Sequence, residues 1–243
     1  MAKSFELVRD ITLETAREKL PLLQPHYEAH LLESPEEIHE ARRLATLTFS
    51  ALGKIDSAEL GEDGVLRHDS FLDRSSFFGT FVDGEMSVTT RLIWTPDGTV
   101  EDLRLPTERI DRDKAIFLKE QPPGTVAEIG ALAKVRGSSN VATLKLLREV
   151  FGFADQNDIR YLVCGLEPKL YPTYNKLFGG ALQRLHDEEI EFPGIIGMQV
   201  PLMIDLRHSF EHQKDEMHKR TLGDRAIGFF VRNYFRPNVE SWH

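Results

Sequence analysis

The chain has 243 residues, with 30 Lys and Arg against 39 Asp and Glu, so its formal net charge is −9 at pH 7. Hydrophobic residues make up 41% and charged residues 28%, which excludes collagen-like, low-complexity and disordered architectures. The acidic balance argues against general nucleic-acid binding, and the single cysteine, Cys164, excludes an intramolecular disulfide. Because the sequence shows neither a signal-peptide pattern nor a run of roughly 18 apolar residues, we expect a cytoplasmic protein.

The first predicted elements are a strand over 27–32 and a helix that begins after Ser34. Ser34-Pro35-Glu36-Glu37 combines a capping serine, a first-turn proline and two carboxylates near the positive end of the helix dipole. Apolar residues then recur at helical spacing until Gly53. The polar region 56–73 is expected to be a loop.

The next segment predicts a β-hairpin. Residues 76–82 and 85–94 are rich in β-branched and aromatic side chains, and Asp83-Gly84 between them is a typical hairpin turn. A long polar connection over 95–125 follows, in which a short helix is expected near 111–119. The remaining predicted elements are, in order, a strand over 126–135, a helix over 141–157, a buried strand over 161–166, a short helix over 168–178 and strands over 181–186 and 199–206.

The composition changes after residue 206, which divides the chain into a domain over 1–206 with an N-terminal helical arm and a C-terminal helical extension over 207–243. His208, Glu211 and His212 have a spacing compatible with metal binding, but the segment is so polar that we expect a solvated helix face and no metal. An apolar stripe further on suits either an interfacial membrane helix or, as we favour, a helix packed on its own domain or on a partner subunit. The stripe consists of Ile227, Phe230, Val231 and Tyr234.

The loop between the strand over 126–135 and the next helix has the composition of a phosphate-binding device. Unsatisfied N–H groups and the dipole at a helix start favour an anion, Gly137 permits close approach of the backbone, and Asn140 is a plausible cap. A plain strand-to-helix turn has the same chemistry, and the residues alone favour that plainer interpretation. The sequence contains no Gly-x-Ser-x-Gly, Walker or Gly-x-Gly-x-x-Gly motif.

Two segments around this loop resemble the GCN5-related N-acyltransferases. Arg136 matches the first position of the family's Arg/Gln-x-x-Gly-x-Gly/Ala loop, and Tyr174, Lys176 and Leu177 match its Tyr-x-Lys-Leu-Gly-Phe segment, whose ending is inverted here as Phe178-Gly179. The resemblance implies an α/β fold with a mixed central β-sheet flanked by helices and a thioester donor. The implied donor-binding residues are Ala133, Val135, Arg136, Gly137, Ser138, Ser139 and Asn140.

The earlier half is similar to N-acyl amino acid synthases and acyl-homoserine-lactone autoinducer synthases. The resemblance lies in 68–73, where Asp69 and Asp73 correspond to the Asp-x-x-Asp region of these synthases, and in the hairpin, Thr89-Thr90-Arg91-Leu92-Ile93 and Glu128-Ile129. It implies transfer of a fatty acyl group to the amine of an amino acid or similar small acceptor. Arg91 could bind the acceptor's carboxylate or order the loop that carries Asp69 and Asp73, and we favour the ordering role.

Direct attack of an amine on a thioester needs a base and an acid. Glu128 is the candidate base, and the alternative is a structural salt bridge to Lys134 or Arg91. Tyr174 is the candidate acid for the departing thiolate, and the alternative is a tyrosine packed in the core.

The loop departs from the family pattern at two positions, where Ser139 and Val141 replace small residues. A poorer pyrophosphate cradle favours an acyl carrier protein, with one phosphopantetheine phosphate, over coenzyme A. Docking of that acidic partner is predicted at a basic cluster, in which Lys145 and Arg148 are expected to point to solvent. The cluster consists of Lys134, Arg136, Lys145 and Arg148. A coenzyme A-dependent N-acetyltransferase and a catalytically silent thioester-binding module are the alternative functions.

Overall fold

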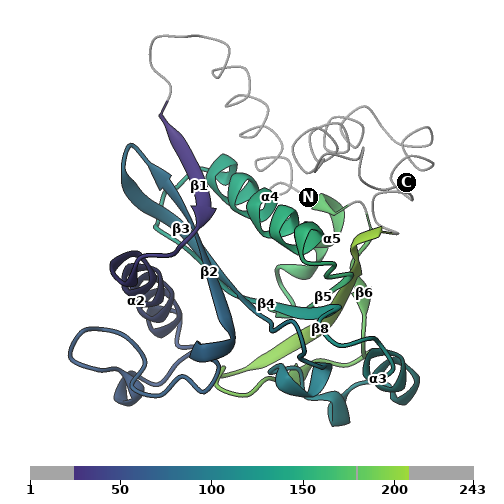
Figure 1. The fold of residues 1–243 in the computed structure, drawn as a ribbon. Coiled ribbons are helices and arrows are strands. Elements are labelled where there is room, and N and C mark those ends of the chain that lie inside the picture. Colours follow the sequence, from purple (N-terminus) through teal and green to yellow (C-terminus); the bar gives the residue numbers. More distant parts are fainter. Residues whose placement is uncertain (1–24, 179, 208–243) are drawn as a thin grey trace.

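The computed structural model describes residues 25–178 and 180–207. The predicted N-terminal arm, the C-terminal extension after residue 207, its metal-like spacing and its apolar stripe therefore lie outside the described residues. Figure 1 shows one twisted sheet with α4 crossing it and α2 at its left. The strands are β1 (Tyr27–Leu31), β2 (Ser75–Val82), β3 (Glu85–Ile93), β4 (Val126–Lys134), β5 (Tyr161–Leu166), β6 (Gln183–Arg184), β7 (Ile190–Glu191) and β8 (Met198–Asp205). The α-helices are α2 (Pro35–Ala51), α3 (Arg112–Lys119), α4 (Asn140–Gln156) and α5 (Tyr171–Leu177).

The described strands pair in the order β1-β2-β3-β4-β5-β8-β6, and β7 pairs with β8. Most pairs are antiparallel, whereas β4 and β5 run parallel because α4 connects them. The hairpin turn is confirmed: Asp83 and Gly84 both have positive φ angles, 52° and 88°, as a two-residue turn that follows the strand twist requires. The mixed α/β sheet predicted from the sequence is thus confirmed.

The two faces of the sheet carry different helices. Phe78 points to the side of α4, where it is buried with Leu144 and Leu147. Its neighbour Phe77 points to the other side, where it is buried with Ala41 of α2. This alternation follows from the two-residue period of a strand, and it places β2 and β3 between α2 and α4.

Several sequence-based boundaries were wrong. The strand expected over 181–186 is only Gln183–Arg184, because Leu182 and Leu185 turn into the core on either side of it. Helix α5 begins at Tyr171 rather than at 168, and β7 was not predicted. The expected loop over 56–73 contains short 3₁₀ helices at Ser57–Glu59 and Leu72–Arg74. Two more 3₁₀ helices, Val100–Asp102 and Thr107–Arg109, lie in the long connection before β4.

Candidate functional site

The sheet is open between its two parallel strands. β4 and β5 pair only where Val126, Ala127 and Glu128 face Tyr161, Leu162 and Val163. Beyond these residues the described parts of the two strands diverge, and a cavity of about 200 Å³ lies between 129–132 of β4 and 164–166 of β5. The split between the strands therefore creates a binding space in the middle of the fold.

This cavity, which we call the acyl cavity, reaches both faces of the sheet. Phe49 of α2 lines it on one face, and Leu147 and Phe151 of α4 line it on the other. Its wall is predominantly apolar, and at Gly165 even a Cβ would approach the Phe192 ring to 2.9 Å. A wall of this kind suits a hydrocarbon chain.

The strand β4 carries a β-bulge where it borders the cavity. Arg91 of β3 faces Gly130, whereas Thr89 faces Ala133, so β4 has one extra residue in this interval. The backbone at Ala131 has a φ of 53°, which is unusual for a residue with a side chain. Bulges are frequent beside active sites because they turn backbone groups away from the ladder.

Tyr174 and Cys164 bring polar atoms to the acyl cavity. Burial raises the pKa of the Tyr174 phenol, and the neighbouring Cys164 raises it further. Burial also raises the pKa of Cys164 to about 12, with a contribution from Glu128. Both groups are therefore protonated at neutral pH. The Tyr174 hydroxyl makes no hydrogen bond to another residue in the described part of the chain, so its proton is available to a bound molecule.

Gln199 of β8 is a polar residue in this apolar wall. Only 4% of the residue is exposed, and its Nε2 atom has no hydrogen-bond partner within residues 25–178 and 180–207. At the rim, Glu167 binds Lys54 at 3.1 Å and Lys169 at 2.6 Å. The hydrogen bond from Lys169 and then that from Lys54 hold the pKa of Glu167 below its usual value.

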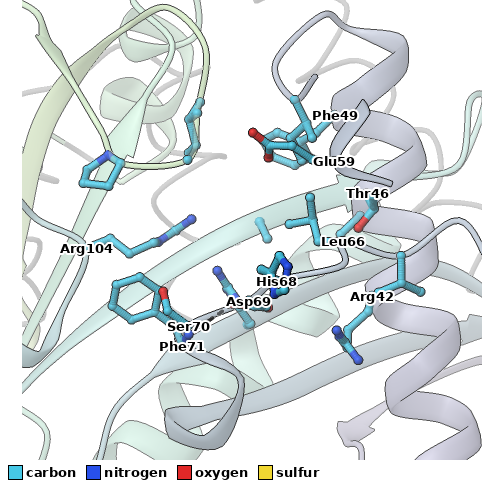
Figure 2. Close-up of a pocket in the computed structure, with 18 of the residues that line it drawn as sticks. Arg42, Thr46, Phe49, Glu59, Leu66, His68, Asp69, Ser70, Phe71 and Arg104 are labelled. Atoms are coloured by element: carbon cyan, nitrogen blue, oxygen red, sulfur yellow. Dashed lines mark hydrogen bonds and ion pairs between the residues drawn. The ribbon is translucent and has the colours of Figure 1, made fainter. Parts of the chain in front are cut away.

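A second cavity of about 180 Å³, which we call the acceptor cavity, lies on the α2 face of the sheet. Figure 2 shows Arg104 entering it from one side and α2, with Arg42 and Thr46, standing at the other. The loop between α2 and β2 supplies Glu59, His68 and further residues. Charged groups of both signs thus surround this space, in contrast to the acyl cavity.

Two buried ion pairs lie beside the acceptor cavity, which is lined by Asp69, Arg91 and Arg104. Arg91 Nη1 donates to Asp69 Oδ2 at 2.7 Å, and burial, followed by the nearby Arg104 charge, lowers the pKa of Arg91. Glu128 Oε1 accepts from Arg104 Nη2 at 2.7 Å and from Nε at 2.8 Å, while Oε2 accepts from the Arg104 backbone N–H at 2.7 Å. Glu128 is fully buried and lines neither cavity. The salt-bridge partner predicted for it, Lys134 or Arg91, was wrong, because the fold places Arg104 over this carboxylate.

The two cavities share part of their wall, namely Phe49, Arg104, Ala131 and Ile195. Ala131 is the left-handed residue of the β4 bulge, and Arg104 is fixed beside it by Glu128. At Gly130 a Cβ would collide with the Arg104 guanidinium, so a larger residue there would have to displace Arg104 from its ion pair with Glu128. The two cavities therefore adjoin at the bulge. Among the predicted acceptor-binding residues, Asp69 lies in the acceptor cavity, whereas the exposed Asp73 lines neither cavity.

The predicted phosphate loop is exposed, but some of its hydrogen-bonding groups are already bonded to side chains of the protein. Ser139, not Asn140, caps α4, since its hydroxyl accepts from the Val141 N–H at 2.9 Å. The predicted cap was wrong because Asn140 is already helical, and its side-chain oxygen accepts from Lys134 Nζ at 3.1 Å. Ser138 exchanges a hydrogen bond of 2.8 Å with Ser87 of β3.

The other predicted donor-binding residues differ in exposure. Gly137 has a φ of 87° and open space around it, and Val135 and Arg136 are exposed. Ala133 is buried in β4. The loop is thus an accessible turn at the start of a helix, with fewer N–H groups available than a glycine-rich cradle offers.

The predicted basic cluster is only partly a free surface. Lys145 does not point to solvent: its Nζ lies 3.4 Å from the Tyr27 carbonyl oxygen and 5.5 Å from the centre of the Tyr27 ring. The prediction was wrong because β1 lies against this side of α4. Lys134 bonds the loop, whereas Arg136 and Arg148 are exposed.

This chain resembles known proteins in its fold rather than in its sequence. No family model matches the sequence, and no curated protein matches it. FeeM, an N-acyl amino acid synthase from uncultured soil microbes, superposes with a TM-score of 0.60 at 21% identity, over 77% of this chain and 95% of that chain. The chain has the fold of this acyl-transferring synthase. BjaI, a CoA-dependent acyl-homoserine lactone synthase, gives 0.58 at 14% identity over 84% and 100% of the two chains. The acyl-homoserine lactone synthase LasI gives 0.53 at 15% identity over 75% and 91%.

The sequence pattern does not single out Arg104 or Arg42 as site residues. Arg104 lies in the aperiodic connection before β4, where nothing in the local pattern separates it from other loop residues. Arg42 lies on the polar side of α2, a pattern that is typical of a solvated helix face.

In the part of the chain that the structure describes, no helix is long and apolar enough to cross a membrane.

Proposed function

We propose that this protein is an N-acyltransferase that moves an acyl group from a thioester to the amine of a small acceptor bearing a carboxylate. The observation that carries this proposal is the junction of an apolar cavity and a charged cavity at the β4 bulge. An acyl chain suits the first cavity and a zwitterionic acceptor suits the second. FeeM, which has the same fold, is an N-acyl amino acid synthase.

A fatty acyl group fits the acyl cavity better than an acetyl group does. The apolar wall continues from the bulge past Leu147 and Phe151 to Leu202 and Ile204 of β8. An acetyl group would leave most of this wall without a partner, so burial of a longer chain is favoured by the hydrophobic effect. A fatty acyltransferase is therefore favoured over a coenzyme A-dependent acetyltransferase.

Acyl carrier protein is the proposed donor. Ser139 already occupies the Val141 N–H, and Ser138 is held by Ser87, so the loop suits a single phosphate better than a pyrophosphate. The exposed Arg136 and Arg148 supply positive charge for an acidic partner. BjaI is CoA-dependent, and acyl-CoA is therefore the donor to test beside the carrier protein.

Arg42 is the proposed anchor for the acceptor's carboxylate. The other two arginines of the acceptor cavity, Arg91 and Arg104, are neutralised by Asp69 and Glu128. Arg42 has no acidic partner within the described residues, so its fork of donors is available to a carboxylate. Arg91 then orders the loop through Asp69, as we favoured from the sequence, and Glu128 positions Arg104 instead of touching the substrate.

In the proposed reaction, the neutral amine attacks the thioester carbonyl at the bulge. Backbone N–H groups that the bulge releases from the ladder are suited to stabilise the oxyanion. The Tyr174 phenol, kept protonated by burial, donates its proton to the departing thiolate. The C–N bond forms, the C–S bond breaks, and the amine's remaining extra proton returns to the phenolate.

The test is a product assay with several donors. Purified protein is incubated with saturated acyl carrier proteins, the matching acyl-CoA thioesters and acetyl-CoA, each with pooled amino acids, and amides are detected by mass spectrometry. An N-acyl amino acid formed from the long-chain donors is the expected result. An acetylated product alone would favour the acetyltransferase alternative, and donor binding without any amide would favour the silent thioester-binding module.

Variants of two adjacent arginines on α2 test the acceptor site. Arg42→Gln is expected to raise the acceptor KM at least tenfold, whereas Arg43→Gln, outside both cavities, leaves it unchanged. A decarboxylated acceptor should react poorly with wild type and be insensitive to Arg42→Gln. Equal effects of the two variants would contradict the assignment.

A further inference from the structure

The proposed reaction requires a base within reach of the acceptor's amine. An amino group is protonated at neutral pH, and only its neutral form attacks a carbonyl. A buried carboxylate that lines neither cavity cannot meet this amine, which removes Glu128 from the role. The base must therefore be found among the side chains that line the two cavities.

The titratable groups of the acyl cavity are unsuitable. Tyr174 and Cys164 are held in their protonated forms, since burial raises both pKa values. Glu167 is bound by two lysines that lower its pKa, which makes it a weaker base than an ordinary carboxylate. None of these groups can accept a proton from an ammonium group near pH 7 with useful efficiency.

Three groups of the acceptor cavity could take a proton: Glu59, His68 and Asp69. Asp69 is bound by Arg91 at 2.7 Å and by the Phe71 N–H at 3.2 Å. Glu59 is an exposed carboxylate, and such a group is a weak base at neutral pH. Histidine is the side chain whose basicity suits proton transfer near pH 7.

His68 occupies a suitable place in this cavity. Figure 2 shows it in the middle of the view, between Arg104 on one side and the α2 residues Arg42 and Thr46 on the other. Its imidazole has no hydrogen bond or ion pair with any residue of the described ranges 25–178 and 180–207, which leaves a ring nitrogen free to accept a proton. The charged groups that line the same space are Arg42, Glu59, Asp69, Arg91 and Arg104. Asp69 neutralises Arg91, and Glu128 neutralises Arg104. The charges near His68 that remain outside these ion pairs are the positive charge of Arg42 and the negative charge of Glu59.

We propose that His68 is the general base that takes the proton from the acceptor's ammonium group. This role rests on the proposed N-acyl transfer. The imidazole removes one proton, the neutral nitrogen forms the C–N bond as the C–S bond breaks, and the thiolate takes the Tyr174 proton. The second amine proton restores Tyr174, and the imidazolium releases its proton to solvent through the exposed side of the cavity. The overall reaction thus converts an ammonium and a thioester into an amide, a thiol and one proton.

The experiment compares His68→Gln with wild type and with His39→Gln, an exposed histidine of α2 that lines neither cavity. Initial rates are measured across pH with saturating thioester. His68→Gln is expected to lower kcat/KM for an amino acid about 100-fold near neutral pH, with an unchanged donor KM. The deficit should shrink as the pH approaches the pKa of the acceptor's amine, where neutral amine is already abundant. Because His68 is exposed, the thermal midpoint should stay at the wild-type value.

A second acceptor separates base catalysis from a structural effect. Aminooxyacetic acid keeps the carboxylate, but its nitrogen is neutral at pH 7 and needs no base before attack. His68→Gln should therefore use it at close to the wild-type rate. Equal losses with both acceptors, a loss independent of pH or no loss at all would overturn the role of His68. A wild-type protein that forms no amide from any donor would overturn the proposed function itself, which the product assay detects separately.

Discussion

The buried pair of Glu128 and Arg104 gives the sharpest prediction for stability. Glu128→Gln keeps the shape of the side chain but removes its charge. One of its two terminal atoms becomes an NH₂ group that faces a donor of Arg104, either the guanidinium or the backbone N–H. The variant also leaves Arg104, whose side chain is only 9% exposed, without a counter-charge.

The expected cost is about 3–5 kcal/mol in the free energy of unfolding, as for removal of one partner from a buried ion pair. In a chain of this size such a loss lowers the melting temperature by roughly 10 °C. Glu191→Gln is the matched control, because Glu191 pairs with Arg109 at 3.1 Å while its side chain is 67% exposed. That variant should cost about 0–1 kcal/mol.

Urea unfolding of the three proteins measures these differences, and the acyl-transfer assay across pH adds a second readout. If Glu128 positions Arg104, activity should fall by the same factor at every pH. Equal stabilities of the two variants would refute the energetic reasoning. A loss confined to low pH would instead indicate that Glu128 takes part in proton transfer, as the sequence suggested.

Three further predictions follow from the two cavities and the loop. Tyr174→Phe should lower turnover by on the order of 100-fold without weakening donor binding, as measured by single-turnover kinetics, and unchanged chemistry would remove the phenol from the mechanism. Arg136→Glu combined with Arg148→Glu should raise the KM for acyl carrier protein but not for an acyl-pantetheine, and added salt should weaken wild-type use of the carrier in the same selective way. Losses with both donors would place the damage in the loop. Gln199→Met should raise the free energy of unfolding by on the order of 1 kcal/mol, since it removes a buried amide without a partner, and a less stable variant would contradict this.

The secondary structure was predictable where a local signal determines it. The Asp83-Gly84 turn, the Ser34 cap and the apolar periodicity of α4 each act over a few residues, and the structure confirms all three. The strand containing β6 was expected to be longer and β7 was not expected, because each is two residues long and exists only by pairing with β8. Their positions depend on a partner strand rather than on their own composition.

The candidate site also contains both residues that the sequence indicates and contacts that depend on distant parts of the chain. Glu128 could be singled out because a carboxylate is unusual at the start of a buried strand, and Tyr174 because its segment resembles that of the GCN5-related N-acyltransferases. The partner of Glu128 could not be named, since Arg104 is 24 residues away in a segment without periodicity. Lys145 was expected in solvent because nothing in α4 indicates that Tyr27, 118 residues away, lies against it.

The sequence by itself therefore determined the order of the main elements and the chemical groups from which a site can be built. Each of these follows from propensities and periodicities that neighbouring residues express together. Only the tertiary structure decided which charges neutralise one another and where space remains. A buried carboxylate must find a donor, but which donor it finds depends on the path of a distant loop. Likewise, the cavity beside the bulge exists because β4 and β5 part after Glu128 and Val163, and this divergence is a property of the assembled sheet.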